Sequence, residues 1–427
     1  MEISVKKLPN SRVEIFFKVS KEEFEKFREK SILKFGRELK TEGFRPGKAP
    51  KEVIEKEVGE ARILEEAVKE VIEENYPKVV LENKIEPITQ PEIEVLPQTN
   101  LETGGGLELK VSFIVFPEIK LPDYKKIAFQ IKRNKVLIEE TEVEDALRWL
   151  QKSRAKFTLK NQPAEKGDFI EIDFSSPQIE AGFQRKDGFI LGEGQFIPGF
   201  EENLVGMTNG EVKNFSLKFP GNHFKKELAG KSFDFKVKVN SIQKMELPEV
   251  NDNWAKGFGN FNDLSSLRES LKEGINIEKE VAESQRVRQE ILEKLNDNSK
   301  VETPEILIER EKSIIFDELK EKIAGVLKMP FEEYLTKIKK TEKELKESFL
   351  EEAQKRAKYD LILRGISLKE KIEVSEEEIK EEIDKMIKNY SVEKVKELDL
   401  EKLKLYIESE IRKIKTLNLL EGLSKLS

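Results

Sequence analysis

Apolar and polar residues alternate near the start of the chain as they do in a strand with one buried face. A capping box at 20–23 then predicts a helix whose apolar stripe runs to about Lys40, and a second helix is expected from about Lys51 to Asn83. Strand-like runs return at 93–96 and 107–115, so residues 1–115 are predicted to form an α+β domain. The apolar positions of the first strand are Val13, Ile15, Phe17 and Val19.

The middle of the chain changes from a sparsely apolar segment to an aromatic one. Residues 116–160 have too few apolar positions for a core of their own, and we interpret them as a linker that docks on its neighbours, with an extended piece and a helix at 142–157. Residues 161–245 hold 11 of the 26 phenylalanines, and alternation is clear at 170–174, 215–219 and 233–239. This pattern predicts a small, mostly antiparallel β domain with an aromatic interior.

Residues 246–427 are predicted to be helical throughout. Between 262 and 427 there are only two prolines and four glycines, and apolar residues recur on one face, for example at 379, 383, 386 and 387. Helix starts are expected at Thr303 before Pro304, at a capping box on Ser375, and at Ser391 and Asp399. Such helices either pair through their apolar stripes or leave part of a stripe open to an unfolded chain.

Charge and composition exclude several classes of function. The chain has 77 Lys+Arg against 84 Asp+Glu, a net charge of −7, which argues against a globally basic nucleic-acid-binding protein but not against a local basic patch. It has no cysteine and one histidine, His223, so thiol nucleophiles, disulfides, histidine triads and two-histidine metal sites are excluded, and no metal or cofactor is expected. Because it lacks a leader-like start and any long apolar run, we expect a cytoplasmic protein without membrane contact.

The segment GFRPGKAP at 43–50 is predicted to be an exposed loop between two helices, because two glycines and two prolines cannot continue a helix. From Lys34 to Lys51 there are six basic and two acidic residues, a local excess of +4 within an otherwise acidic domain. Such a basic tip suits an anionic partner such as ribosomal RNA or an acidic protein patch, and Phe44 offers an aromatic anchor. On these residues alone, an ordinary turn flanked by lysines is the alternative.

The same eight residues resemble the ribosome-docking signature of the trigger factor family, chaperones that bind beside the polypeptide exit tunnel, whose pattern is G-F-R-x-G-x-x-P. The family commonly has a basic residue where this chain has Pro46, and Lys48 is the nearest replacement for that charge. The resemblance implies docking on ribosomal protein and RNA through this loop. The five matching positions are Gly43, Phe44, Arg45, Gly47 and Pro50.

The segment 192–201, which contains GQFIPGFE, resembles the FKBP-type prolyl isomerase domain. The resemblance implies that the backbone N–H of Ile197 holds the substrate carbonyl, while Gln184 replaces a usual carboxylate and His223 falls near a usual pocket tyrosine. Rotation about the imide bond faces a barrier of about 18–20 kcal/mol, and it needs no nucleophile or metal, only a desolvated and twisted peptide. The implied pocket residues are Phe174, Phe183, Phe196, Phe200 and Phe235, for which ordinary core packing is the alternative.

Together the two resemblances imply a multidomain α+β protein. It has an α+β docking domain (1–115), a linker (116–160), an FKBP-like antiparallel β domain (161–245) and an all-α C-terminal domain with helical arms (246–427). The implied function is an ATP-independent, ribosome-associated chaperone of nascent or unfolded chains with prolyl isomerase activity, weakly dimeric off the ribosome. The rival hypotheses are a free-standing FKBP-type isomerase with a helical dimerisation region and a local RNA-binding module.

Overall fold

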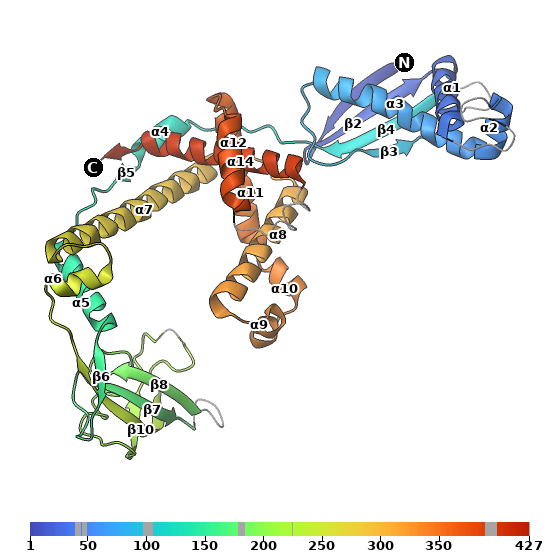
Figure 1. Cartoon of the computed structure of the whole chain (residues 1–427). Coiled ribbons are helices and arrows are strands. Elements are labelled where there is room, and N and C mark those ends of the chain that lie inside the picture. Colours follow the sequence, from blue (N-terminus) through green and yellow to red (C-terminus); the bar gives the residue numbers. More distant parts are fainter. Residues whose placement is uncertain are drawn as a thin grey trace. The chain divides into compact units, whose positions relative to one another are not determined.

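The computed structural model describes residues 1–38, 44, 49–96, 106–177, 184–223, 225–388 and 399–426, and its ribbon is shown in Figure 1. The chain divides into two compact units. One contains Met1–Arg133 together with Ser284–Ser427, and the other contains Asn134–Glu283.

The first unit begins with a four-stranded antiparallel sheet of order β1-β2-β4-β3, built from β1 (Glu2–Leu8), β2 (Arg12–Val19), β3 (Glu92–Val95) and β4 (Leu107–Ile114). The alternation predicted along β2 is confirmed, because its inward residues Val13, Ile15, Phe17 and Val19 are buried. Strand β1 was not predicted. It is an edge strand whose side chains are mostly exposed, so its sequence lacks the apolar alternation that marks a half-buried strand.

Three helices accompany this sheet: α1 (Lys21–Glu38), α2 (Lys51–Val58) and α3 (Glu60–Glu82). The capping box is confirmed, since Glu23 N–H donates to Ser20 Oγ at 3.4 Å and Ser20 N–H donates back to the Glu23 carboxylate at 3.3 Å. The prediction of one helix from 51 to 83 is wrong. Gly59, with φ 82°, separates α2 from α3, and this left-handed φ is accessible to glycine but costly for other residues.

A small core holds α1, α2 and α3 together on both sides of the 43–50 segment. Gly36 on α1 lies so close to α2 that a Cβ atom there would come within 2.6 Å of Ile54 Cδ1. Close packing therefore holds the C-terminal part of α1 against α2, and these two helices flank the 43–50 segment. The buried residues of this core are Ile32, Ile54, Val58 and Ile63.

The rest of the first unit is helical apart from a short two-stranded sheet. It contains α4 (Tyr124–Gln130), the end of α7 (Leu264–Asn298), α8 (Glu305–Lys322), a π-helical turn (Ile323–Leu327), α9 (Phe331–Ile338), α10 (Glu342–Glu347), α11 (Leu350–Lys369), α12 (Glu376–Ile387) and α14 (Leu400–Gly422). Strand β11 (Lys425–Leu426) pairs in parallel with β5 (Lys132–Arg133). Helices α4, α7, α11 and α14 share one core, which includes Ile131, Ile291, Ile362 and Leu420.

The predicted helix starts have different outcomes. The capping box at Ser375 is confirmed, and Asp399 caps α14 by accepting a hydrogen bond from Lys402 N–H at 3.1 Å. The prediction that Thr303 caps a helix is wrong, because Pro304 occupies the N-cap position of α8 with no side-chain cap. Its carbonyl instead accepts from Leu307 N–H at 3.0 Å. Ser391 lies outside the described residues.

The second unit contains α5 (Glu140–Ser153), a five-stranded antiparallel sheet, α6 (Asp252–Ala255), a 3-10 turn (Lys256–Phe258) and the start of α7. The sheet has the order β6-β10-β7-β8, with β9 also paired to β10, and its strands are β6 (Lys156–Leu159), β7 (Phe169–Ser175), β8 (Gln184–Ile190), β9 (Val212–Lys218) and β10 (Ser232–Glu246). The helix predicted at 142–157 ends earlier, because residues 156–159 pair with β10 as strand β6. Pairing with a distant strand here overrides the local helical pattern.

These elements confirm the predicted class, a multidomain α+β protein with a small antiparallel β domain and a helical C-terminal region. Among the described residues, no helix combines the length and the apolar character that crossing a membrane requires.

Candidate functional site

The second unit brings together the phenylalanines expected to line a pocket. Phe200 lies at their centre. Its ring stacks on that of Phe196 with centroids 4.4 Å apart. It also makes edge-on contacts with the rings of Phe174 and Phe235, at centroid distances of 5.8 Å and 5.4 Å. These rings come from β7, from the turn after β8 and from β10, so the fold of the sheet assembles them. Phe183 lies outside the described residues.

Burial separates these residues into two groups. Phe200 is 1% exposed and Phe235 is 5% exposed, so both are core residues as well as pocket candidates. Phe174, Phe196 and Ile197 are only partly buried and pack against that core. A peptide could therefore reach the second group directly, while the first group supports it from below.

Three further rings that contact these phenylalanines were not predicted as pocket residues. Phe189 lies 4.7 Å from Phe196, and Phe215 and Phe219 lie 6.0 Å and 6.3 Å from Phe235. Phe215 and Phe219 stand on the alternating stretch 215–219 that predicted a strand, so their inward direction was readable from the sequence. Their distance from the other rings depends on the pairing of β9 with β10, which no local pattern reveals.

His223 lies at the margin of the aromatic cluster. Its ring packs edge-on against Phe219 with centroids 5.0 Å apart, and its Nδ1 accepts a hydrogen bond from Lys225 N–H at 3.2 Å. The side chain is partly exposed. This placement suits a residue at the rim of a pocket, and a second histidine or cysteine that would turn it into a metal site is missing from the sequence.

The turn between β8 and the central rings is organised by Glu201, whose role was not predicted from the sequence. Its side chain is buried, and its carboxylate accepts hydrogen bonds from the N–H groups of Gly192 at 2.7 Å, Gly194 at 3.2 Å and Phe196 at 3.1 Å. Burial by itself would raise the pKa of Glu201, but the backbone N–H groups lower it overall. The carboxylate is therefore ionised at neutral pH.

Gly199 shows why this turn requires glycine. Its φ is 91°, and a Cβ atom there would lie 2.9 Å from Leu217 Cδ2 on β9. Any larger residue would be strained in its backbone and would also press on the sheet. Gly199 thus lets the turn pass close to β9 and places Phe200 in the centre of the ring cluster.

The expected docking segment lies between α1 and α2, and two of its seven expected residues are described. Phe44 is 43% exposed, and Pro50 is exposed and precedes α2, where its carbonyl accepts from Val53 N–H at 3.1 Å. Gly43, Arg45, Pro46, Gly47 and Lys48 lie outside the described residues. The described part of the segment thus presents a large aromatic side chain to solvent.

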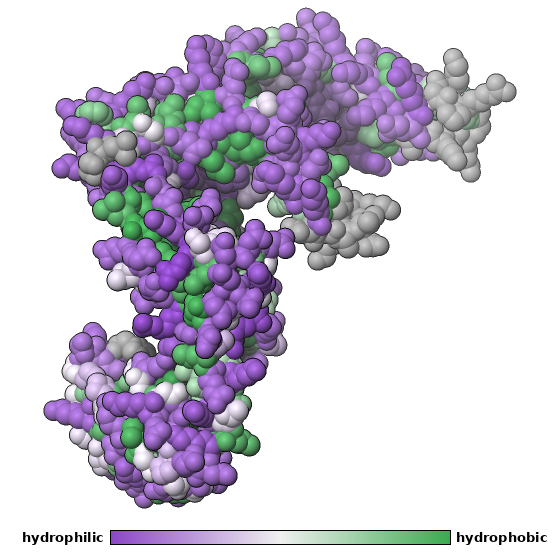
Figure 2. Space-filling model, turned by 60° about the vertical axis from the view of Figure 1, so that its left-hand side comes forward, coloured by the Kyte–Doolittle hydropathy of each residue, from purple (hydrophilic) through white to green (hydrophobic). Residues whose placement is uncertain are grey.

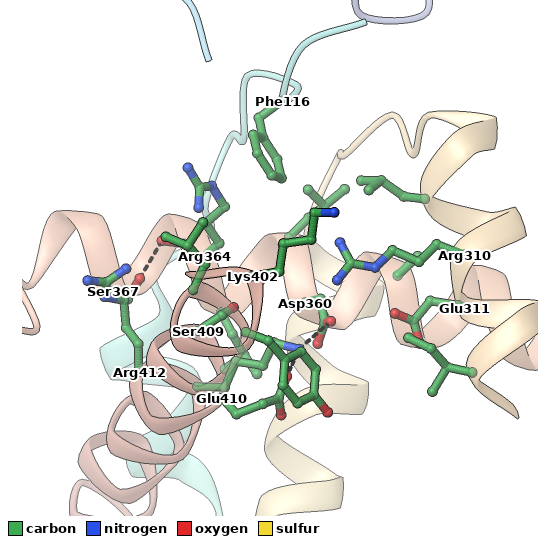
Figure 3. Close-up of a pocket in the computed structure, with 18 residues that line it drawn as sticks. Phe116, Arg310, Glu311, Asp360, Arg364, Ser367, Lys402, Ser409, Glu410 and Arg412 are labelled. Carbon is green, nitrogen blue, oxygen red and sulfur yellow. Dashed lines mark hydrogen bonds and ion pairs between the residues drawn. The ribbon is translucent and has the colours of Figure 1, made fainter. Parts of the chain in front are cut away.

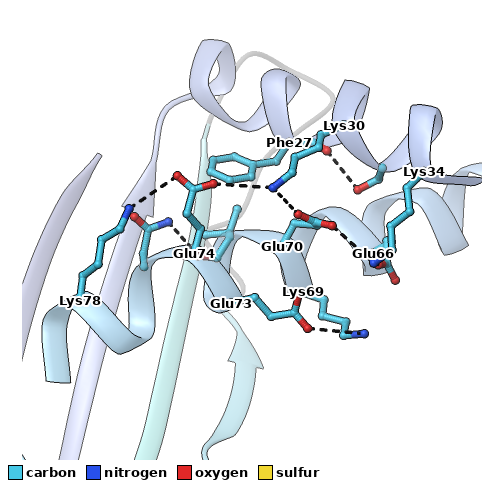
Figure 4. Close-up of polar contacts among 12 residues, drawn as sticks. Phe27, Lys30, Lys34, Glu66, Lys69, Glu70, Glu73, Glu74 and Lys78 are labelled. Atoms are coloured by element: carbon cyan, nitrogen blue, oxygen red, sulfur yellow. Dashed lines mark hydrogen bonds and ion pairs between the residues drawn. The ribbon is translucent and has the colours of Figure 1, made fainter. Parts of the chain in front are cut away.

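Charge around this segment is more balanced in space than along the sequence. Lys34 on α1 bonds to Glu66 and lies 3.4 Å from Glu70, as Figure 4 shows, and its pKa is raised chiefly by the hydrogen bond to Glu66. Lys51 lies 2.6 Å from Glu29. Two of the six basic residues counted from 34 to 51 are therefore compensated by carboxylates that are distant in sequence.

A pocket of about 430 Å³ lies in the helical part of the first unit (Figure 3). Helices α8 and α14 both pack on α11, and the pocket lies between α8 and α14. Two of its apolar residues on α14 are exposed, Leu405 by 67% and Tyr406 by 44%. Apolar residues also gather in patches on an otherwise hydrophilic surface in Figure 2. The apolar lining includes Phe116, Leu307, Ile314, Leu361, Leu405 and Tyr406.

Charged groups border this apolar lining. Lys413 lies 2.6 Å from Asp360 and 2.8 Å from Glu410, so one ammonium group is shared by two carboxylates. Burial raises the pKa of Asp360, and nearby Glu410 raises it further, although Lys413 opposes both effects. Arg310 on α8 has no ion-pair partner among the described residues and points into the pocket (Figure 3).

Comparisons with known proteins agree over nearly the whole chain. Residues 1–150 match the family model of the bacterial trigger factor protein, residues 263–421 match that of its C-terminus, and residues 160–240 match that of FKBP-type peptidyl-prolyl cis-trans isomerases.

Curated relatives are similar over nearly their whole length. A trigger factor of Caldicellulosiruptor saccharolyticus is 34% identical over 403 residues, which cover 93% of this chain and 91% of that protein. A trigger factor of Clostridium kluyveri is 30% identical over 436 residues, which cover 100% of both chains. A solved structure of the trigger factor chaperone, from work on promiscuous substrate recognition in folding and assembly, is similar in fold, with a TM-score of 0.50, 23% identity and 99% coverage of both chains.

Proposed function

We propose that this chain, which belongs to the trigger factor family, docks on the ribosome through the 43–50 segment. It holds nascent or unfolded polypeptides in the pocket between α8 and α14. The chain is a chaperone with an FKBP-type peptidyl-prolyl isomerase domain. In this proposal residues 1–115 dock, 116–160 link, 161–245 isomerise and 246–427 hold clients, all in the cytoplasm.

The observation that carries the docking proposal is the exposure of Phe44. An aromatic side chain that is 43% exposed, on a segment anchored at both ends by a packed core, can insert into a partner without unfolding its own domain. Because Lys34 and Lys51 are compensated by carboxylates, we assign the electrostatic part of docking to Arg37, which is exposed and lacks an ion-pair partner among the described residues, together with Arg45 and Lys48. These cations would face ribosomal RNA.

For client binding, we propose the pocket between α8 and α14. Its exposed Leu405 and Tyr406 offer apolar surface to an extended chain, and the surrounding charges keep that surface soluble. Many weak apolar contacts suit clients of unrelated sequence, and release then requires no nucleotide hydrolysis.

For prolyl isomerisation, we propose the aromatic pocket of the second unit. Phe174 and Phe196 would contact the proline ring, Phe200 and Phe235 would form the base, and the Ile197 N–H would hold the carbonyl before the proline. His223 is placed at the rim and Phe183 completes the set. Removing the carbonyl from water weakens the amide resonance that creates the rotation barrier.

Off the ribosome, we propose weak self-association through exposed apolar positions such as Ile277 and Val281 on α7. Sedimentation velocity over a range of protein concentrations should show a reversible increase in mass. A single monomeric species at all concentrations would contradict this part of the proposal.

The docking proposal is tested by co-sedimentation with ribosomes. We expect Phe44→Ala to weaken ribosome binding at least about tenfold, because truncating an aromatic anchor at an interface commonly costs ~2 kcal/mol. Leu33→Ala is the matched control: Leu33 is also exposed, by 54%, but lies on the outside of α1 rather than on the segment.

Equal binding of wild type and both variants would reject docking through this segment and favour the free-standing isomerase. Tight, steeply salt-dependent binding to protein-free ribosomal RNA, without preference for whole ribosomes, would favour the RNA-binding module.

A further inference from the structure

The turn at 192–200 leaves few of its backbone N–H groups available to a ligand. Glu201 accepts those of Gly192, Gly194 and Phe196, and the N–H of Phe200 donates to Ile197 O at 3.0 Å. Residue 198 is proline and has no N–H. Among the described residues, the N–H groups of Ile197 and Gly199 have no acceptor, whereas those of Phe196 and Phe200 on either side of them are engaged.

The Glu201 carboxylate does more than accept hydrogen bonds from N–H groups that would otherwise lack an acceptor: it also fixes their directions. A buried ionised group that accepts three backbone hydrogen bonds acts as a fixed centre, and the peptide planes that donate these bonds are oriented around it. Because the Phe196 N–H is directed to Glu201, the rotation of the peptide plane before Phe196 is fixed, and the next N–H is held in a defined direction. The Phe196 ring, whose own backbone N–H donates to Glu201, stacks on Phe200 with ring centroids 4.4 Å apart.

We infer that Glu201 is a positioning residue of the isomerase site: its carboxylate orders the 192–197 turn so that the Ile197 N–H and the Phe196 ring are presented to the substrate together. This inference rests on the proposed role of Ile197 and Phe196. Glu201 does not contact the substrate and takes no part in the bond rotation. Glu201 orders the Ile197 N–H before the substrate binds, so binding does not have to order it.

The inference predicts a specific pattern of kinetics. The Ile197 N–H is useful chiefly to the twisted carbonyl of the transition state, so a loosened donor lowers kcat more than it raises KM. Glu201→Gln keeps the size of the side chain but replaces one acceptor oxygen by an amide donor that faces backbone N–H groups. We expect kcat for an X-Pro peptide to fall about tenfold or more, since hydrogen bonds to charged groups are worth on the order of that factor.

The experiment compares three full-length proteins: wild type, Glu201→Gln and Glu202→Gln. Glu202 is the matched control, because it is the next residue and is exposed. Circular dichroism establishes that each protein is folded at the assay temperature. Peptide isomerisation then gives kcat and KM, and amide hydrogen exchange of residues 192–197 reports the order of the turn without depending on activity. We expect lower kcat and faster exchange for Glu201→Gln alone.

The outcomes separate this inference from the proposed isomerase site. A wild-type protein that does not accelerate isomerisation overturns the proposed site, and the inference with it. An active wild type together with a folded Glu201→Gln protein that keeps its kcat, or its slow exchange at 192–197, overturns the positioning role alone. If Glu201→Gln is unfolded, amide exchange at 192–197 in the wild type is followed instead as the pH falls below the ordinary carboxyl pKa, because the pKa of Glu201 is lowered. Protection that disappears as Glu201 is protonated, before the rest of the domain opens, supports the role, and simultaneous loss contradicts it.

Discussion

The aromatic pocket and the helical pocket both present apolar surface, but their side chains are held in different ways. In the aromatic pocket, rings contact one another at 4.4 to 6.3 Å, and a buried carboxylate fixes the adjoining backbone. In the helical pocket, which is the pocket between α8 and α14, Leu405 and Tyr406 extend from α14 into an open space of about 430 Å³. The first arrangement suits one chemical group in one geometry. The second suits many chains of different sequence, because its surface can be contacted in many ways.

The largest expected effect is the loss of the central ring of the aromatic cluster. Phe200→Ala should destabilise the second unit by about 3–5 kcal/mol, because the ring is 1% exposed and contacts four other phenylalanines, so its removal leaves a cavity. Urea unfolding followed by near-ultraviolet circular dichroism measures the change.

The matched comparison is Phe157→Ala on the edge strand β6, where the ring is 45% exposed. It should cost well under half as much as Phe200→Ala. Equal costs for the two substitutions would mean that the ring cluster is loosely packed, and the contrast between the two pockets would fail.

An intermediate effect is expected in the helical pocket, and on binding rather than on stability. Leu405→Asp should weaken the suppression of aggregation of a denatured client several-fold, because it places a charge on the exposed apolar surface. The free energy of unfolding should change by less than about 0.5 kcal/mol, since Leu405 is 67% exposed. Light scattering of a denatured client in the absence of ATP measures the suppression of aggregation, and urea unfolding measures the free energy of unfolding.

Ile414→Asp on the same helix serves as the control, because Ile414 is 52% exposed and is absent from the pocket lining. Similar losses of chaperone activity in both variants would show that clients bind apolar surface anywhere on α14, and not this pocket.

The smallest expected effect concerns pH and has opposite signs in the two regions. Glu201 has a lowered pKa, so it contributes stability above the ordinary carboxyl pKa, and this contribution is lost as the pH falls through the lowered value. Asp360 has a raised pKa, caused first by burial. Its contribution is therefore complete below the ordinary carboxyl pKa and is lost as the pH rises through the raised value.

Urea unfolding across the acid range tests this difference. On acidification, the stability advantage of wild type over Glu201→Gln should shrink, whereas its advantage over Asp360→Asn should grow. If both stability differences shrink or both grow on acidification, one of the two explanations is wrong: either backbone N–H groups do not dominate the pKa of Glu201, or burial does not dominate that of Asp360.

The sequence by itself was sufficient for the fold class, the buried face of β2, the Ser20 and Ser375 capping boxes and the family. Each of these depends on residues close together in the chain, where side-chain period and capping chemistry act locally. Strand β1, the break at Gly59 and strand β6 were not predictable in this way. An exposed edge strand has no period, one glycine within a helical pattern is ambiguous, and β6 exists because β10 supplies its partner.

The tertiary structure alone decided what the charged residues do. Along the chain, Lys34 and Lys51 add to a basic loop, but in space Glu66, Glu70 and Glu29 compensate them. Glu201 is part of a readable motif, yet only the folded turn shows three backbone N–H groups converging on its carboxylate. The physical reason is range: periodicity and capping act over a few residues, whereas hydrogen bonds and ion pairs depend on which distant groups the fold brings within about 3 Å of each other.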